Sequence, residues 1–360
     1  MTTRHNWTRE EIIEIYNRPM MDLLYEASTI HRQFHDPNVV QVSTLLSIKT
    51  GGCPEDCGYC PQAARYHTNI EGNDLMSVAQ VKAQALRAKA GGSSRVCMGA
   101  AWRNVKDGPE FDEVLEMVRT INKLDMEVCC TLGMLTENQA QRLAEAGLYA
   151  YNHNLDTSED YYKEVISTRS FEDRIETIAN VRKTNVTVCS GGIIGMGESI
   201  SDRAGMLVAL STLDPQPESV PINALVAVEG TPMEDEKPVE IWEMIRMVAT
   251  TRIVMPETQV RLSAGRMNMS REGQALCFFA GANSIFAGDK LLTTPNPDVN
   301  EDMKMFEMLG LQPQKPFVKM AQPETVEADE SQFTGLGEKP RWSRPGHAIE
   351  RNIEASIKGK

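Results

Sequence analysis

The chain has 360 residues, of which 41% are hydrophobic and 24% charged, and its formal net charge is -13. This composition is typical of a globular protein, and no apolar run approaches the roughly 20 residues of a membrane helix, so we expect no membrane partner. The negative charge argues against nucleic acid, whose binding depends on clustered lysine and arginine. The first residues are too polar and acidic for a secretory signal, so we expect a cytoplasmic protein that acts on small molecules.

Two helices are predicted at the start of the chain. Apolar residues recur at helical spacing from about Thr8 to His35, and the pattern breaks at Arg18-Pro19. We interpret residues 1–38 as a helical extension that precedes the main domain.

Short apolar or β-branched segments then alternate with longer amphipathic ones. Two of the amphipathic segments have clear ends: Ser77 precedes one that stops at a Gly-Gly pair, and Thr136 precedes one that stops at Gly147. Such alternation predicts parallel strands joined by right-handed crossovers, and eight units favour a closed (β/α)8 TIM-type barrel over an open sheet. The predicted strands lie at 41–48, 94–101, 126–133, 149–156, 186–195, 219–228, 259–266 and 283–288.

The barrel domain is assigned to residues 39–292, and a C-terminal helical extension to residues 293–321, with a helix pattern around 302–309. Few large apolar side chains occur after about residue 322. A segment of that composition cannot bury enough apolar surface to offset its loss of chain entropy. We therefore predict that residues 322–360 form a disordered tail.

Three cysteines lie in the Gly- and Pro-rich stretch after the first predicted strand: Cys53, Cys57 and Cys60. This position is the C-terminal rim of a barrel, where active sites of this fold lie. Three thiolates can hold a cubane iron–sulfur cluster whose usual complement is four cysteines, which leaves one iron open. A structural zinc site completed by a distant residue and a set of unliganded thiols are the alternatives, although the chain has no second C-x2-C pair.

Four side chains in separate predicted strands form a second candidate site: Cys97, Cys129, Cys189 and Arg261. Inward-facing residues of neighbouring barrel strands meet in layers, so these groups could converge in the interior. Each cysteine alone could instead be a packed core residue, and the arginine could form an interior ion pair. Cys130 must point the opposite way from its neighbour, towards the helices, and Cys277 is assigned to the core.

Polar residues alternate in the fourth predicted strand. Asn152, Asn154 and Asp156 share one face by strand periodicity, and we expect that face to be the barrel interior. Buried amides require hydrogen-bond partners, and Asn223 would approach from the sixth predicted strand. His153 should point the other way and support its neighbours rather than act as a ligand.

The loop Cys53-x3-Cys57-x2-Cys60, with Tyr59 before the last cysteine, resembles the signature of the radical S-adenosylmethionine (SAM) enzymes. The resemblance implies a [4Fe-4S] cluster on the three cysteines, with SAM chelating the open iron and Tyr59 belonging to the SAM site. It also implies that one electron from the cluster splits the sulfonium, giving methionine and a 5′-deoxyadenosyl radical. A barrel mouth would shelter that radical from water.

Longer stretches resemble one branch of these enzymes, the biotin synthase family. They run from about residue 38 to 320 and include VQVSTLLSIKTGGCPEDCGYCPQ, YNHNLDT, VCSGGIIGMGE, VRLSAGR and AGANSIFAGDKLLTTPNP. The resemblance implies a [2Fe-2S] cluster that gives a bridging sulfide to the substrate. Its ligands would be Cys97, Cys129, Cys189 and Arg261. An arginine ligand should bind weakly, which suits an expendable cluster.

This resemblance also implies the substrate and its contacts. Sulfur would be inserted between C6 and C9 of dethiobiotin, and radicals are required because neither C–H bond is acidic. Asn154 would lie between dethiobiotin and the SAM ribose, while Asp156 would contact the ribose and Arg174 the methionine carboxylate. Asn152 and Asn223 would line the dethiobiotin pocket, where their amides suit a ureido ring.

The implied partners are a flavodoxin or ferredoxin as electron donor, iron–sulfur assembly proteins, and a second copy of the chain in a homodimer. A radical SAM enzyme with a different substrate is one alternative, although lipoyl synthase is disfavoured because an extra cysteine triplet near the N-terminus is absent. A zinc- or iron-binding scaffold, in which the strand cysteines merely pack, is the non-enzymatic alternative.

Overall fold

The computed structural model describes residues 3–288 and 290–315, and all structural statements refer to them. They belong to one compact unit, Met1–Pro316, which contains the N-terminal helices, the barrel and the first part of the predicted C-terminal extension. The predicted tail, 322–360, lies outside the described residues. Among the described helices, none has the length and apolar character needed to cross a bilayer.

Parallel strands close into a barrel in the order β1-β2-β3-β4-β5-β7-β8-β9, and β9 pairs back with β1. All eight predicted strand positions are confirmed, but the fifth is divided into β5 and β6. The division falls at Ser190-Gly191, where the backbone of Pro221 lies so close that a Cβ on Gly191 would clash with it. The strands are β1 (Val39–Lys49), β2 (Arg95–Ala100), β3 (Glu127–Thr131), β4 (Ala150–Asn152), β5 (Thr187–Cys189), β6 (Gly192–Ile194), β7 (Ser219–Ala224), β8 (Gln259–Leu262) and β9 (Ser284–Phe286).

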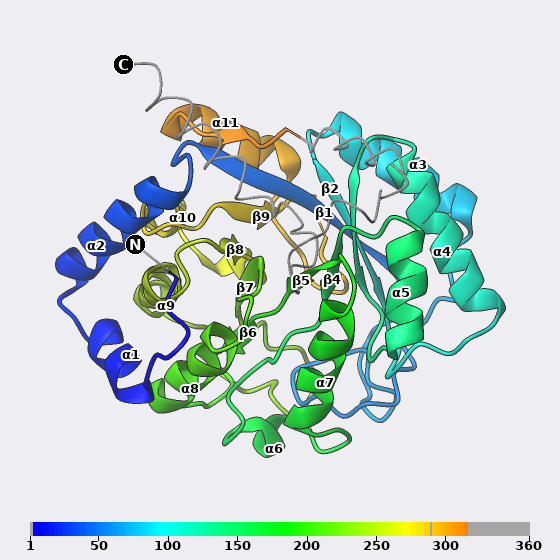
Figure 1. The fold of residues 1–360 in the computed structure, drawn as a ribbon, viewed down its shortest axis with the longest axis horizontal. Coiled ribbons are helices and arrows are strands. Elements are labelled where there is room, and N and C mark those ends of the chain that lie inside the picture. The colour runs from blue at the N-terminus through cyan, green and yellow to red at the C-terminus, as the bar shows by residue number, and fades with distance from the viewer. Residues whose placement is uncertain (1–2, 289, 316–360) are drawn as a thin grey trace, which may run out of the picture. The chain divides into compact units, whose positions relative to one another are not determined.

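Helices surround the strands (Figure 1). The predicted N-caps are confirmed, because the side chains of Ser77 and Thr136 each accept from the backbone three residues on and each form a capping box with a glutamine. The helices that follow the strands are α3 (Val78–Ala90), α4 (Pro109–Asn122), α5 (Glu137–Glu145), α6 (Tyr162–Val165), α7 (Phe171–Arg182), α8 (Ile200–Ser211), α9 (Ile241–Val254) and α10 (Arg271–Phe279).

The segments before and after the barrel pack on its outside. Helices α1 (Arg9–Tyr16) and α2 (Met20–Phe34) are separated at Arg18-Pro19, as predicted, and contact α8 and α9. After the barrel come α11 (Val299–Leu309) and β10 (Gln312–Pro313), which pairs with the start of β1. The helix predicted around 302–309 is confirmed and begins three residues earlier, at Val299, after an Asp298 N-cap.

Buried apolar residues form two separate clusters, one on each side of the strands. The large cluster lies between strands and helices and contains Cys130 and Cys277. The small cluster contains Cys97 and Cys129 together with Ala150, Phe286 and Leu291. The neighbouring residues Cys129 and Cys130 therefore face opposite sides of β3, as strand geometry predicts.

A buried ion pair joins α11 to the barrel. Arg266, in the 3-10 turn Arg266–Asn268, donates from both terminal nitrogens to the carboxylate of Asp302, and each residue is 1% exposed. The guanidinium also donates to Gln274 and to the carbonyl oxygen of Phe286 in β9. These contacts therefore connect the 3-10 turn to α10, β9 and α11.

Replacing Arg266 with methionine should lower the free energy of unfolding by about 3–5 kcal/mol, because it leaves the Asp302 carboxylate buried without its cation. The matched control is Arg271→Met, which removes the exposed pair with Glu301 between α10 and α11. That change should cost less than about 1 kcal/mol. Denaturant unfolding measures both values, and equal losses would contradict the assignment of Arg266.

Candidate active site

A cavity of about 310 Å³ lies at the C-terminal ends of the barrel strands. Its walls come from the cysteine loop, from the barrel strands and from residues 291–294. Most of the predicted site residues line it: Cys53, Cys57, Tyr59, Cys60, Cys97, Cys129, Asn152, Asn154, Asp156, Arg174, Asn223 and Arg261. Cys189 does not line the cavity, but its sulfur accepts from two wall residues, Asn152 at 3.2 Å and Arg261 at 3.8 Å.

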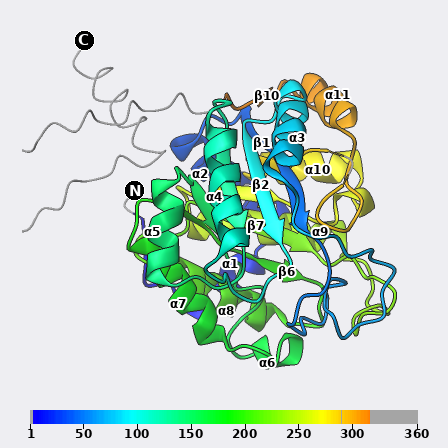
Figure 2. The same ribbon diagram turned by 90° about the vertical axis from the view of Figure 1, so that its right-hand side faces the viewer.

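The cysteine loop is folded compactly over the end of β1. Figure 2 shows the segment between β1 and α3, in blue, beyond the strand end. The Cys53 amide donates to the Gln62 carbonyl at 3.0 Å, and the Cys60 amide donates to the Cys57 carbonyl at 2.9 Å. These bonds hold the three thiols around the mouth of the cavity.

The chemistry of the three thiols suits a cationic cofactor. Burial raises the pKa of Cys60 to about 12, and it also raises the pKa values of Cys53 and Cys57. The charged thiolate form is therefore stable at these positions only beside positive charge, which bound iron supplies. Among the described residues, no three His, Cys, Asp or Glu side chains converge closely enough to hold one metal ion.

The strand residues predicted to form a second site meet in the barrel interior. Cys97 and Cys129 are register partners across β2 and β3, and their thiols share a hydrogen bond. That bond lowers the pKa of Cys97 and raises that of Cys129; the nearby Arg261 charge adds to the lowering at Cys97. Three thiols and a guanidinium fit the residue types implied for a [2Fe-2S] cluster.

Arg261 is held by polar residues of the two strands that close the barrel. Its Nε donates to Ser284 at 2.9 Å, and its Nη2 donates to Gln41 at 3.0 Å. Its guanidinium also lies over the Phe286 ring, 4.6 Å from the centroid. The alternative prediction for Arg261 was an interior ion pair, and none of the described residues forms one with it. Its Nη1 faces the sulfur of Cys189.

A hydrogen-bonded triad connects the loop to the wall after β4. The carboxylate of Asp156 accepts from the Tyr59 hydroxyl at 2.9 Å and forms an ion pair with Arg174. The Arg174 Nε also donates to the Tyr162 hydroxyl at 2.9 Å. Three residues predicted to contact SAM therefore contact one another.

The fourth strand is shorter than predicted. It ends at Asn152, so Asn154 and Asp156 reach the cavity from the following loop, where Asp156 has a left-handed backbone with φ of 69°. The prediction that these side chains lie at the cavity is confirmed, but strand periodicity does not place them there. His153 lines the same cavity, so the prediction that it points the other way was wrong. Its ring stacks on Tyr151, and its buried Nε2 has no hydrogen-bond partner among the described residues.

The predicted substrate amides are partly used by the protein itself. Asn152 donates to the Asn154 side chain at 3.2 Å, and Asn154 accepts from the Gly191 amide at the same distance. Asn223 donates to the Gly192 carbonyl at 3.0 Å and accepts from the Ala264 amide at 3.1 Å. These contacts fix the amide orientations before any substrate enters.

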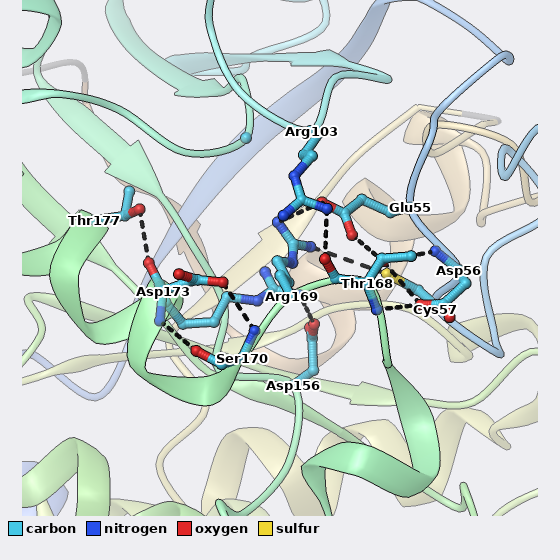
Figure 3. A network of polar contacts seen from close by, with 12 residues as sticks. Glu55, Asp56, Cys57, Arg103, Asp156, Thr168, Arg169, Ser170, Asp173 and Thr177 are labelled. Carbon is cyan, nitrogen blue, oxygen red and sulfur yellow. Dashed lines mark hydrogen bonds and ion pairs between the residues drawn. The ribbon is translucent and has the colours of Figure 1, made fainter.

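Sequence reasoning missed a polar network that involves the acidic residues between the first two loop cysteines (Figure 3). Asp56 accepts from the amides of Ser167 and Thr168 at 2.9 and 3.0 Å and from the Ser167 hydroxyl. Burial opposes ionisation of Asp56, but these hydrogen bonds prevail and lower its pKa to about 2. The sequence pointed to this network only through two adjacent acidic residues, Glu55 and Asp56, in an otherwise Gly- and Pro-rich loop.

Asp56→Asn should cost about 2 kcal/mol of unfolding free energy at pH 7, since the pKa falls from 3.8 to about 2 on folding. A carboxyl group whose pKa is lowered on folding stabilises the folded state at pH values above its unfolded pKa. That stabilisation is lost as the pH falls through its folded pKa. The difference between the native chain and the variant should therefore shrink between about pH 4 and pH 2. Urea unfolding across that range measures it, and a difference independent of pH would contradict it.

Comparison with known proteins shows the family to which the chain belongs. Residues 47–209 match the model of the Radical SAM superfamily, and residues 221–312 match the Biotin and Thiamin Synthesis associated domain. A curated biotin synthase of Flavobacterium psychrophilum is 88% identical over 357 residues, which is 99% of each chain. Another, from Sorangium cellulosum, is 58% identical over 313 residues, 87% of this chain and 90% of its own.

Solved structures show the same fold at low identity. A methylornithine synthase superposes with a TM-score of 0.72 at 18% identity and covers 86% of this chain and 94% of its own. The FeFe-hydrogenase maturase HydG from Carboxydothermus hydrogenoformans also has a TM-score of 0.72, at 15% identity, over 86% of this chain and 76% of its own. With full-length relatives at such high identity, the chain belongs to the biotin synthase family of the radical SAM enzymes.

Proposed function

We propose that the chain converts dethiobiotin to biotin by radical insertion of sulfur between C6 and C9. One observation supports this most directly: a single cavity has three loop thiols at its mouth and, deeper in the barrel, a set of thiols with an arginine. A sulfur-inserting enzyme needs a radical source and a sulfur source within reach of one substrate. Two thiol sets along one cavity meet that need.

The first set would hold a [4Fe-4S] cluster on Cys53, Cys57 and Cys60, and the second would hold a [2Fe-2S] cluster. The proposed ligands of the second are Cys97, Cys129, Cys189 and Arg261. When bound, the first cluster with SAM supplies 5′-deoxyadenosyl radicals and the second supplies sulfide. The chain separates the two sets by placing one on a loop and the other inside the strands.

The triad after β4 would orient SAM. Arg174 uses its Nε and Nη2 within the protein, so the plane of the guanidinium is fixed. Its Nη1 makes no hydrogen bond within the described residues and would donate to the methionine carboxylate. Asp156 and Asn154 would contact the ribose, and Tyr59 would hold Asp156 in place.

Dethiobiotin would bind between the two thiol sets. Asn152, Asn154 and Asn223 have amides already oriented by protein contacts, and their remaining donors and acceptors suit a ureido ring. Residues 291–294 form another part of the wall. Preoriented amides reduce the entropy cost of binding a small polar ring.

The proposed partners follow from this chemistry. A flavodoxin or ferredoxin would deliver electrons to the rim, and iron–sulfur assembly proteins would load both thiol sets. We also propose a homodimer in the cytoplasm.

Cys53→Ala should abolish SAM cleavage, because the first thiol set is lost. Cys97→Ala should retain some SAM cleavage and yet make no biotin, because only the sulfur source is affected. An anaerobic assay with dethiobiotin, SAM and a reductant measures 5′-deoxyadenosine and biotin separately. Biotin at native yield from Cys97→Ala would refute the sulfur-donor assignment, and 5′-deoxyadenosine without biotin from the native chain would favour another substrate.

Two adjacent cysteines provide a matched comparison. Cys129→Ala should abolish biotin formation, whereas Cys130→Ala should keep it, because Cys130 belongs to the outer core between strands and helices. Both residues are buried, so loss of packing is similar in the two variants. Quantifying iron, acid-labile sulfide and biotin for both variants tests the pair, and equal loss in both would contradict an interior site.

A further inference from the structure

Arg169 is a buried cation beside the cysteine loop that no part of the proposed function uses. Its side chain is 8% exposed, and its Nη2 lies 3.9 Å from the sulfur of Cys57 (Figure 3). Its Nη1 lies 4.0 Å from the Glu55 carboxylate, and its Nε has no hydrogen-bond partner among the described residues. Burying an arginine with so few partners is costly, which points to a role at the cavity that it lines.

The backbone on both sides of Arg169 is held in place. On one side, the Asp56 carboxylate accepts from the amides of Ser167 and Thr168. On the other, Ser170 caps α7: its hydroxyl accepts from the Asp173 amide at 3.2 Å, and its amide donates to the Asp173 carboxylate at 2.9 Å. The guanidinium is therefore directed at Cys57 by a rigid segment.

The other charged side chains near Cys57 do not provide an equivalent positive charge at its sulfur. Glu55 is also within 3.6 Å of Arg103, and Thr168 donates a hydrogen bond to it, so its negative charge is shared among several partners. Arg174 is engaged by Asp156 in an ion pair. Among these cations, only Arg169 has an N–H directed at a loop sulfur.

We propose that Arg169 raises the reduction potential of the cluster at Cys53, Cys57 and Cys60 by donating to the Cys57 sulfur and placing a positive charge beside it. Reduction adds one negative charge to the cluster, so a nearby cation and an N–H···S bond stabilise the reduced form more than the oxidised form. The inference rests on the proposed function, because it requires a cluster on these three cysteines.

The test is a redox titration of the anaerobically purified full chain without SAM, followed by electron paramagnetic resonance of the reduced cluster. Arg169→Met removes the charge and the N–H donors. At a fixed solution potential it should lower the ratio of reduced to oxidised cluster about tenfold, which corresponds to a shift of 59 mV for a one-electron couple. Arg169→Lys keeps the charge and should recover most of that shift. Arg103→Met removes a more distant cation and keeps the contact to sulfur intact, so it should lower the potential by clearly less than Arg169→Met does.

Several results would overturn the inference. One is an Arg169→Met potential equal to that of the native chain; another is an equal shift from Arg103→Met. A normal potential combined with weaker SAM binding would instead make Arg169 a carboxylate contact. If Arg169→Met does not load iron, Arg169→Gln replaces it, with the same expected direction. Absence of the cluster signal from the native chain would refute the proposed function itself, so the two failures are distinguishable.

Discussion

Closure of the barrel between β1 and β9 is the constraint on which the site depends. Their pairing brings Gln41 and Ser284 side by side, and these two residues hold Arg261 from β8. Because the ring is closed and all its strands are parallel, inward side chains share one interior and all carboxyl ends share one rim. The thiols of β2, β3 and β5 meet only for this reason.

The rim combines buried charges of both signs. Asp56 accepts from backbone amides, Glu55 lies within 3.6 Å of Arg103, and Asp156 pairs with Arg174, so each of these carboxylates has a compensating partner. The thiols are the exception, since burial raises their pKa values. A site of this kind is stable as a thiolate set only when a cationic group binds to it.

Much of the fold could be predicted from local patterns. Helix ends at Ser77, Thr136 and the Arg18-Pro19 break depend on contacts within a few residues, and all three are confirmed. The opposite orientations of Cys129 and Cys130 follow from strand geometry alone. The fourth strand is confirmed but ends early, at Asn152; the left-handed backbone of Asp156 and its bridge to Gly192 are not visible in an alternating pattern.

Local patterns were enough to predict the alternation of strands and helices and to find the three-cysteine loop, and the resemblance to known enzymes indicated the family. These features are local or are repeated throughout a family. Three contacts become visible only in the folded chain: Arg169 lies against Cys57, Asp56 accepts from the backbone before α7, and Arg261 hydrogen-bonds to Gln41 and Ser284. The reason is physical: each of these contacts joins residues more than 20 positions apart, and their distance is set by how the closed sheet and its loops pack, which no local pattern encodes.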